Sequence, residues 1–227
     1  MKNPVGLIIA AAGSGTRMQS ATRKPFLDLN GQTILHRTLE RFVGTGGIVQ
    51  VILTVNAEDY ARKDELLMEK LPLMLTDIVP GGKTRTESIA NALAVLDGEV
   101  EIVLVHDAVR PFVRSEVIRG VRDAAVEYGA AIAAAPVKDT IKRASGAVVT
   151  ETVRREGLYV AQTPQGFRRE VILKAYQKRG AAEYTDDAEV VEKTGAKVVI
   201  VESGHDNFKI TTPEDLVMAL AIVGSQR

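Results

Sequence analysis

Residues 5–17 read VGLIIAAAGSGTR, an apolar run that passes directly into a glycine-rich loop. The run Val5–Ala10 is continuous rather than alternating, which is typical of a strand that is buried on both faces of a parallel sheet. Two glycines spaced by one residue let the backbone turn sharply and bring its N–H groups close to a bound group. Arg17 and Lys24 follow the turn. Amides and cations together suit a polyphosphate, although a tight strand-to-helix turn with solvated basic residues has the same pattern.

The rest of the chain alternates between strand-like and helix-like segments. Apolar runs predict further strands, and apolar residues at helical spacing predict the helices between them. The strands are expected at 48–55, 76–80, 101–105, 130–135 and 197–201, and the helices at 32–42, 57–70, 86–96, 115–128, 169–178, 185–194 and from Thr212 onward. This succession predicts one Rossmann-like α/β domain over residues 1–227, with a mostly parallel twisted sheet and helices on both faces.

Residues 138–160 interrupt this rhythm with a weak, polar alternation about Ser145-Gly146. The pattern predicts a β-hairpin arm that projects from the domain. Its exposed edges would favour pairing with a second copy, although an ordinary solvated hairpin has the same composition. After the arm, residues 163–167 (TPQGF) are expected to form a turn that opens the next helix.

Three loops leave the carboxyl ends of predicted strands, at 11–17, 81–85 and 106–111. In doubly wound sheets the ligand crevice lies beyond these ends, so the loops should converge on one side. Asp107 could hold Mg²⁺ beside phosphate oxygens there, or it could simply cap the following turn. Ser88 lies one turn into the helix behind Gly81-Gly82, where the simplest expectation is an exposed helix residue.

Composition excludes several classes of protein. The chain of 227 residues has 29 basic and 29 acidic residues, so any anion site must be local and nucleic-acid binding is not expected. It has no cysteine, which excludes disulfides and thiolate catalysis and fits the cytoplasm. Lys2 before the first apolar run resembles a short signal peptide, but the glycine loop that follows favours a core strand. No apolar stretch is long enough to span a membrane.

Three familiar motifs fail. Met18 stands where a dinucleotide-binding loop needs its third glycine, and Asp77 stands where a Walker loop ending at Gly82-Lys83-Thr84 needs a glycine. No GxSxG elbow occurs, which argues against a Ser-His-Asp hydrolase. The three histidines have no metal-ligand spacing between them.

Taken together, seven motifs in one order resemble the 2-C-methyl-D-erythritol 4-phosphate cytidylyltransferases of the non-mevalonate isoprenoid pathway, which are nucleotidyltransferases of GT-A-like fold. The motifs are Ala11-Ala12-Gly13-x-Gly15-x-Arg17-Met18, Lys24-Pro25-Phe26, Gly81-Gly82…Arg85…Ser88, His106-Asp107-Ala108-Val109-Arg110-Pro111, Asp139-Thr140-Ile141-Lys142, Thr163-Pro164-Gln165 and Asn207-x-Lys209-Ile210-Thr211-x-Pro213-Glu214-Asp215. The resemblance extends over nearly the whole chain.

The resemblance implies transfer of CMP from CTP to the phosphate of 2-C-methyl-D-erythritol 4-phosphate, with release of pyrophosphate. Arg17 and Lys24 would stabilise the transition state, and Arg155 and Lys209 would hold the acceptor phosphate. Other substrate contacts are implied at Ala11, Ala12, Gly13, Gly82, Ser88, Asp107, Ala108, Arg110 and Thr140. Mg²⁺ would bridge triphosphate oxygens, with Asp107 contacting it directly or through water. The arm would reach a second subunit of a homodimer, so Thr140 and Arg155 would complete the partner's site.

Other functions stay open at this point. Ribitol-5-phosphate cytidylyltransferases share several motifs, but that group typically has Ala-Gly-Gly at residues 11–13 and Ser at position 108, where this chain has Ala-Ala-Gly and Ala108. Transfer to another sugar phosphate, or a non-catalytic nucleotide-binding protein on the same sheet, are further alternatives. Arg154 precedes Arg155 where relatives often have an acid, so either arginine could bind the acceptor phosphate.

Overall fold

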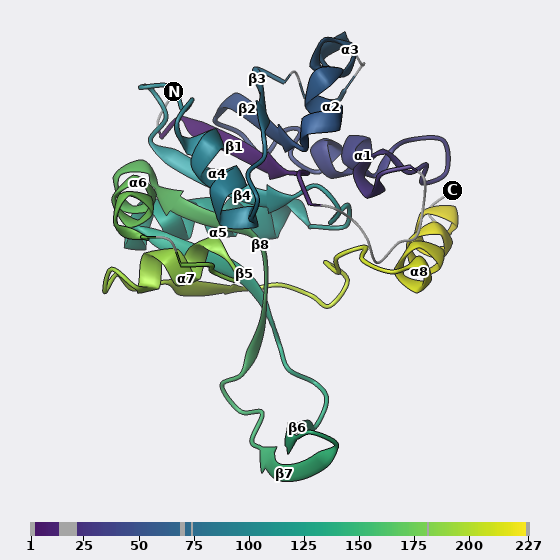
Figure 1. Ribbon diagram of the computed structural model, residues 1–227, viewed down its shortest axis with the longest axis vertical. Coiled ribbons are helices and arrows are strands. Elements are labelled where there is room, and N and C mark those ends of the chain that lie inside the picture. Colours follow the sequence, from purple (N-terminus) through teal and green to yellow (C-terminus); the bar gives the residue numbers. More distant parts are fainter. Residues whose placement is uncertain (1–2, 14–21, 69–70, 74, 181, 226–227) are drawn as a thin grey trace.

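A seven-stranded sheet forms the centre of the molecule (Figure 1). The computed structural model describes residues 3–13, 22–68, 71–73, 75–180 and 182–225. The strand order is β3-β2-β1-β4-β8-β5-β9, and β8 is antiparallel to both neighbours while the other pairs are parallel. The strands are β1 (Val5–Ala10), β2 (Ile48–Val55), β3 (Asp77–Pro80), β4 (Ile102–Asp107), β5 (Ala130–Pro136), β8 (Tyr159–Arg168) and β9 (Val199–Glu202). The prediction of a mostly parallel sheet is confirmed.

Helices cover both faces of this sheet, as predicted. One face packs against α1 (Ile34–Glu40) and α5 (Ser115–Tyr128), and the other against α4 (Arg85–Leu93), α6 (Arg169–Lys178) and α7 (Asp187–Glu192). The sequence of β1 is apolar throughout because the strand is buried on both faces. Leu7 and Ile9 belong to the core cluster on one face of the sheet, and Ile8 belongs to the cluster on the other.

A smaller core cluster packs the last helix, α8 (Pro213–Gly224), against the segment that contains Leu29 and Ile34. Leu29, Val109 and Ile210 are buried in this cluster, which therefore joins three segments far apart in the sequence. Helix α8 begins with a capping box in which the Thr212 hydroxyl accepts from the Asp215 amide and the Asp215 carboxylate accepts from the Thr212 amide. The sequence predicted this helix start.

The expectation of a turn at residues 163–167 was wrong, because these residues lie inside strand β8. Pro164 is tolerated there because the ladder with β4 begins at Gln165 and the ladder with β5 is irregular between Ile132 and Ala134, so no regular pairing needs a donor at this position. Gly166 is required by packing, since a Cβ atom there would lie 2.8 Å from Val121 Cγ1. Proline and glycine in this segment therefore mark a buried irregular strand.

The predicted helix at residues 57–70 is divided. Helix α2 (Ala57–Ala61) ends at Arg62, whose φ and ψ are −108° and 23°, and α3 (Lys63–Met68) follows. Residues 69–70 lie outside the described part of the chain. The predicted strand at 101–105 extends to Asp107.

The arm projects from the body of the domain, as the sequence predicts (Figure 1). Strands β6 (Ile141–Ser145) and β7 (Val148–Val153) form a separate two-stranded sheet and turn at Gly146, whose φ is +57°. Val148 and Val149 leave 70% and 58% of their surface exposed. A single hairpin of this kind is only marginally stable in water.

Within the described residues, none of the helices combines the length and the apolar character that crossing a bilayer would require.

Candidate functional site

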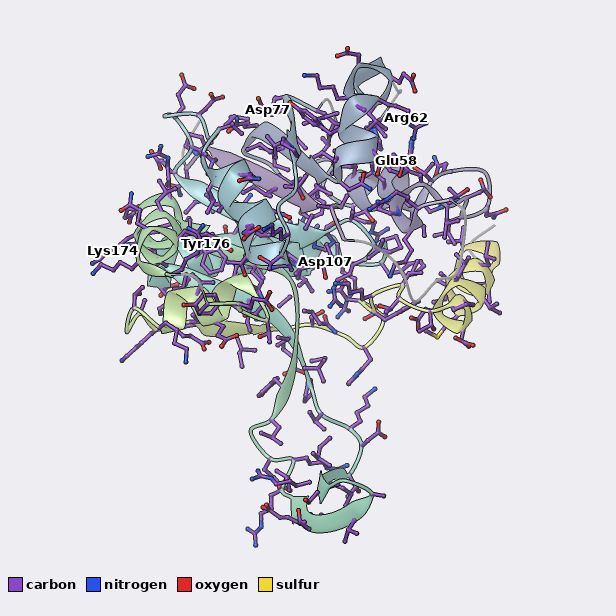
Figure 2. The ribbon with its side chains drawn as sticks, in the orientation of Figure 1. Glu58, Arg62, Asp77, Asp107, Lys174 and Tyr176 are labelled. Atoms are coloured by element: carbon purple, nitrogen blue, oxygen red, sulfur yellow. The ribbon has the colours of Figure 1, made fainter. Side chains whose placement is uncertain are left out.

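A cavity of about 620 Å³ opens at the carboxyl ends of β1, β3 and β4. Register explains the convergence, because Ala10 at the end of β1 pairs with both Thr54 of β2 and Asp107 of β4. The cavity is lined by eight of the predicted site residues, namely Ala11, Ala12, Gly13, Lys24, Gly82, Ser88, Asp107 and Lys209. The expected convergence of the three loops on one side of the sheet is confirmed for their described residues, which for the first loop are 11–13. Figure 2 shows Asp107 near the centre of the body, below α4.

Glycines shape two walls of this cavity for different reasons. A Cβ atom at Gly81 would lie 2.3 Å from Ala12 Cβ, so packing between the two loops requires glycine there. A Cβ atom at Gly82 would lie 2.2 Å from Glu87 Cβ. At Gly13, by contrast, an added Cβ would meet nothing within 4 Å. Gly13 is exposed and leaves its backbone open to close approach by a ligand.

Ser88 is 3% exposed, so the simple expectation of a surface position was wrong. Its hydroxyl accepts from the Gly82 amide at 3.1 Å and donates to the Thr84 carbonyl oxygen at 2.9 Å. Thr84 also caps α4, because its side chain accepts from the Glu87 amide. Ser88 therefore holds the 81–84 loop in place from behind while it lines the cavity.

Asp107 is surrounded by three cations. Its Oδ2 atom lies 3.1 Å from Arg110 Nε and 3.2 Å from Lys209 Nζ, and its Oδ1 atom lies 3.8 Å from Arg85 Nε. Burial alone would raise the pKa of this carboxyl, but Lys209, Arg85 and Arg110 together lower it well below its usual range. Asp107 is therefore ionised at neutral pH.

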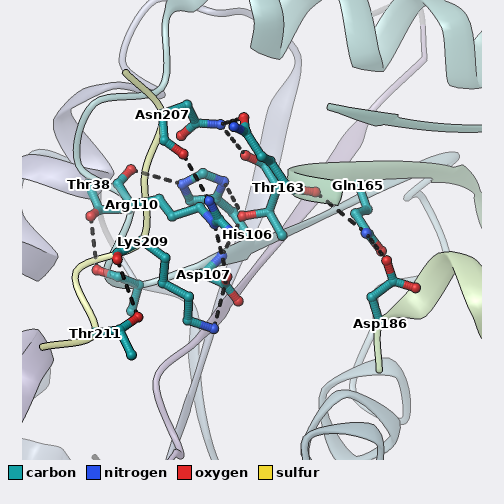
Figure 3. A network of polar contacts seen from close by, with 12 residues as sticks. Thr38, His106, Asp107, Arg110, Thr163, Gln165, Asp186, Asn207, Lys209 and Thr211 are labelled. Atoms are coloured by element: carbon teal, nitrogen blue, oxygen red, sulfur yellow. Dashed lines mark hydrogen bonds and ion pairs between the residues drawn. The ribbon is translucent and has the colours of Figure 1, made fainter. Parts of the chain in front are cut away.

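A chain of hydrogen bonds behind Asp107 determines the position of its backbone (Figure 3). The Asp107 amide donates to Thr163 Oγ1 at 3.0 Å, and that hydroxyl lies 3.1 Å from His106 Nδ1. The other ring nitrogen, Nε2, is 3.2 Å from the Arg110 carbonyl oxygen, which can only accept. His106 is therefore protonated on Nε2, and its Nδ1 atom accepts a hydrogen bond from the Thr163 hydroxyl. Burial lowers the pKa of His106 to about 4, so the ring is neutral.

Asn207 attaches the segment that carries Lys209 to the same network. Its side-chain amide donates to Gln162 Oε1 at 2.8 Å and to the Thr163 carbonyl oxygen at 2.9 Å, and its backbone carbonyl oxygen accepts from Arg110 at 2.8 Å. The sequence analysis gave no role to Thr163 or Asn207. Both lie in motifs that the sequence analysis quoted, but their roles depend on contacts with residues far along the chain, which the motifs do not reveal.

Lys24 also lines the cavity, from the segment that follows the first loop. It begins a 3-10 turn (Lys24–Phe26) with Pro25 buried behind it, and Lys24 Nζ donates to the Thr211 carbonyl oxygen at 3.3 Å. The Asp215 carboxylate accepts from the Thr212 amide at 2.9 Å and so orients the peptide group that contains this carbonyl. Lys24 and Lys209 consequently line one cavity although they lie near opposite ends of the chain.

The remaining predicted residues lie elsewhere. Ala108 is buried and Arg110 is 12% exposed, and neither lines the cavity. Thr140 and Arg155 are exposed on the arm, where the Arg155 guanidinium donates to the Lys138 carbonyl oxygen. Arg17 lies outside the described residues. The roles of these five residues stay predictions.

Two arginines that the sequence analysis did not assign to the site also line the cavity. Arg23 donates to the Gly13 carbonyl oxygen at 2.7 Å and lies 3.2 Å from buried Asp59. Arg85 donates to Asp187 Oδ2 at 2.7 Å. Burial alone would lower the pKa of Arg85, but Asp187 and Asp107 raise it above its usual range. The ion pairs Arg23–Asp59 and Arg85–Asp187 each join two different elements, and sequence periodicity does not reveal such contacts.

The described residues contain no group of three or more histidine or acidic side chains that could hold a metal ion. Among the described residues that line the cavity, Asp107 is the single one with a carboxylate. Proteins bind Mg²⁺ through one or two carboxylates together with substrate phosphates. The donor set therefore fits a cation that enters with a polyphosphate, rather than one bound by protein ligands alone.

Comparison with known proteins agrees with this geometry. The family model described as 2-C-methyl-D-erythritol 4-phosphate cytidylyltransferase matches residues 5–225. A protein of that name from Geobacillus kaustophilus is 43% identical over 221 residues, which cover 96% of each chain.

Solved structures give the same result. The 4-diphosphocytidyl-2C-methyl-D-erythritol synthase of Anaerococcus prevotii superposes with a TM-score of 0.82 at 32% identity and covers 99% of each chain. The 2-C-methyl-D-erythritol 4-phosphate cytidylyltransferase of Thermus thermophilus has a TM-score of 0.79 at 33% identity, over 97% of this chain and 99% of that one.

Proposed function

Because this chain belongs to the 2-C-methyl-D-erythritol 4-phosphate cytidylyltransferase family, we propose that its cavity transfers CMP from CTP to 2-C-methyl-D-erythritol 4-phosphate. The products are 4-diphosphocytidyl-2-C-methyl-D-erythritol and pyrophosphate. The observation that carries the proposal is the convergence of Lys24, Lys209 and the 11–13 backbone on one cavity at the carboxyl edge of the sheet. The recognition of the family from the sequence is confirmed.

The chemistry needs charge neutralisation rather than proton transfer. An oxygen of the acceptor phosphate forms a bond to the α-phosphorus of CTP while the bond from that phosphorus to the bridging oxygen breaks, and pyrophosphate leaves. The attacking phosphate is already anionic at neutral pH, so no general base is required. This agrees with the neutral, fully hydrogen-bonded state of His106, the one histidine at the edge of the site that the structure describes.

Each cation then has a separate task. Lys24, and Arg17 by analogy with the family, stabilises negative charge that grows at the α-phosphate. Lys209 holds the acceptor phosphate, and Asp107 keeps the Lys209 ammonium in place at 3.2 Å until that phosphate arrives. Gly13, Gly82 and Ser88 form the wall against CTP. Asp107 would hold Mg²⁺, directly or through water, and the bound cation would neutralise triphosphate charge.

We propose that the arm completes this site in a second copy of the chain. Thr140 and Arg155 lie on the arm and do not line the cavity of their own chain, while the arm exposes apolar side chains such as Val148. A hairpin that is marginal by itself and apolar on its surface is stabilised by packing against a partner. In a homodimer, Arg155 of one chain would then bind the acceptor phosphate in the other.

Pyrophosphate release tests the activity. We expect release when CTP and 2-C-methyl-D-erythritol 4-phosphate are both present, and little release with either substrate alone. Ribitol 5-phosphate as acceptor, and UTP as donor, test the alternative transfer reactions. Binding of CTP without any release would instead identify a nucleotide-binding protein that lacks catalysis.

Mixing two impaired variants, assayed with the acceptor well below its KM, tests the shared site. In a mixture of Lys24→Ala and Arg155→Ala chains, exchange of subunits creates dimers in which one site has both residues intact. We expect about one quarter of the wild-type activity to return, because half of the dimers are mixed and each has one intact site. Activity that stays at the mean of the two separate variants would show that each arm serves its own chain or that no dimer forms.

A further inference from the structure

A buried carboxylate outside the cavity holds one of the cavity's arginines. Asp187 begins helix α7, is fully buried and does not line the cavity. Its Oδ2 atom accepts from the Arg85 guanidinium at 2.7 Å and its Oδ1 atom accepts from the Tyr176 hydroxyl at 2.5 Å. Both carboxylate oxygens thus have strong donors, as a buried charge requires.

The backbone of Asp187 is held as firmly as its side chain. Gln165 of β8 accepts from the amides of Asp187 and Ala188 at 3.1 and 3.0 Å, and its side-chain amide donates to Asp186 at 2.8 Å (Figure 3). The first turn of α7 is thereby attached to the centre of the sheet. Arg85 is consequently held from a rigid part of the body.

Arg85 connects this carboxylate with the centre of the site. Its Nε atom lies 3.8 Å from Asp107 Oδ1, whereas Arg110 and Lys209 contact Oδ2. Among the described ion pairs, Arg85 is therefore the cation on the second oxygen of Asp107. If Lys209 turned from Asp107 to a substrate phosphate, an Arg85 side chain that Asp187 holds in place would still pair with Asp107.

We propose that Asp187, with Tyr176 behind it, is a positioning residue for the nucleotide wall of the cavity. It acts through Arg85, which it orients along the wall formed by Gly82 and Ser88 and toward Asp107. The inference deepens the proposed function and rests on it for the identity of the nucleotide. A bond that merely joined α4 to α7 would affect stability alone, whereas a positioning bond also affects nucleotide affinity.

Single substitutions give the first test. Asp187→Asn has one oxygen for two donors, so either Arg85 or Tyr176 loses its acceptor. We expect a loss of about tenfold to hundredfold in kcat/KM for CTP, comparable with that of Arg85→Met, with a smaller change in KM for the acceptor. Asp77→Asn is the matched control, because its carboxylate is partly buried and accepts from Gln50 at the far end of β3. Its kinetics should match the wild type.

The double variant separates positioning from stability. Asp187→Asn with Arg85→Met removes both charges, so its melting temperature should rise above that of Asp187→Asn. Its kcat/KM for CTP should nevertheless equal that of Arg85→Met, because Asp187 has no other route to the nucleotide. Activity that recovers along with the melting temperature, or losses that simply add, would overturn the proposal.

Two further measurements keep the inference testable. If Asp187→Asn does not fold, Tyr176→Phe in the wild-type and Arg85→Met backgrounds gives the same cycle with a milder change. Calorimetric titration with CTP alone reports affinity without turnover. Lost CTP affinity in the variants supports the positioning role even if the acceptor is a different sugar phosphate, and unchanged affinity together with unchanged kcat/KM contradicts it.

Discussion

The body and the arm both carry predicted substrate-binding residues, but they hold them in different ways. Around Asp107, each polar group is held by buried partners from several elements, as the links from Thr163 to His106 and from Asn207 to Arg110 show. On the arm, Thr140 and Arg155 are exposed just outside a two-stranded sheet that pairs with no other described strand. The site residues of the body are therefore preorganised within one chain, whereas those of the arm are exposed.

The largest expected effect comes from a substitution in the body. Lys24→Ala should lower kcat by about 10³-fold while the arm stays intact, because one preorganised donor to a developing charge contributes roughly this much. Steady-state pyrophosphate release measures it, with thermal unfolding to show that the variant folds. Lys174→Ala, at an exposed position of α6, is the control and should have wild-type turnover. Near-normal turnover of Lys24→Ala would remove this residue from the mechanism.

A pH series examines the buried network of the body. His106 stays neutral in the folded state down to its pKa of about 4, whereas the unfolded chain takes up a proton near pH 6.5. Between these values the unfolded state binds more protons, so the free energy of unfolding should fall by about 3 kcal/mol as the pH is lowered through this window. Urea unfolding at several pH values measures the slope. His106→Gln should have a shallower slope, and an identical slope would mean that other groups cause it.

Removing the arm sharpens the comparison from the other side. Val137 donates to the Leu158 carbonyl oxygen, so a short turn can join the base of the arm in place of residues 139–157. We expect the melting temperature of the body to change little, while the dimer is lost and kcat/KM for the acceptor falls by about 10²-fold as Thr140 and Arg155 disappear. Light scattering and steady-state kinetics measure these effects. Unfolding of the body would show that the two regions are not independent.

The smallest effect distinguishes the two neighbouring arginines of the arm. Arg155→Ala should raise KM for the sugar phosphate by about tenfold and leave KM for CTP unchanged, because a charged hydrogen bond to phosphate is lost. Arg154→Ala is the matched control and should have little effect on either constant. The reverse result would assign the acceptor phosphate to Arg154, and an effect confined to CTP would contradict a role of the arm in acceptor binding.

The sequence by itself determined the features that depend on neighbouring residues. The apolar run of β1, the glycine loops after β1 and β3 and the Thr212 cap are local patterns, and the alternation of segments implied a parallel sheet with its site at the carboxyl edge. The motifs together also identified the family, which the comparisons confirm. Pro164 and Gly166 misled the prediction, because turn residues also occur in a strand whose ladder is irregular.

Only the tertiary structure decided which distant side chains meet. Periodicity shows which face of an element is buried, but it does not show which element packs against that face or in what register. For this reason the contacts of Arg85 with Asp187 and of Lys24 with Thr211 could not be predicted, whereas the loops that carry these cations could. The insertion of β8 between β4 and β5 places Thr163 behind His106, and no local pattern encodes that strand order.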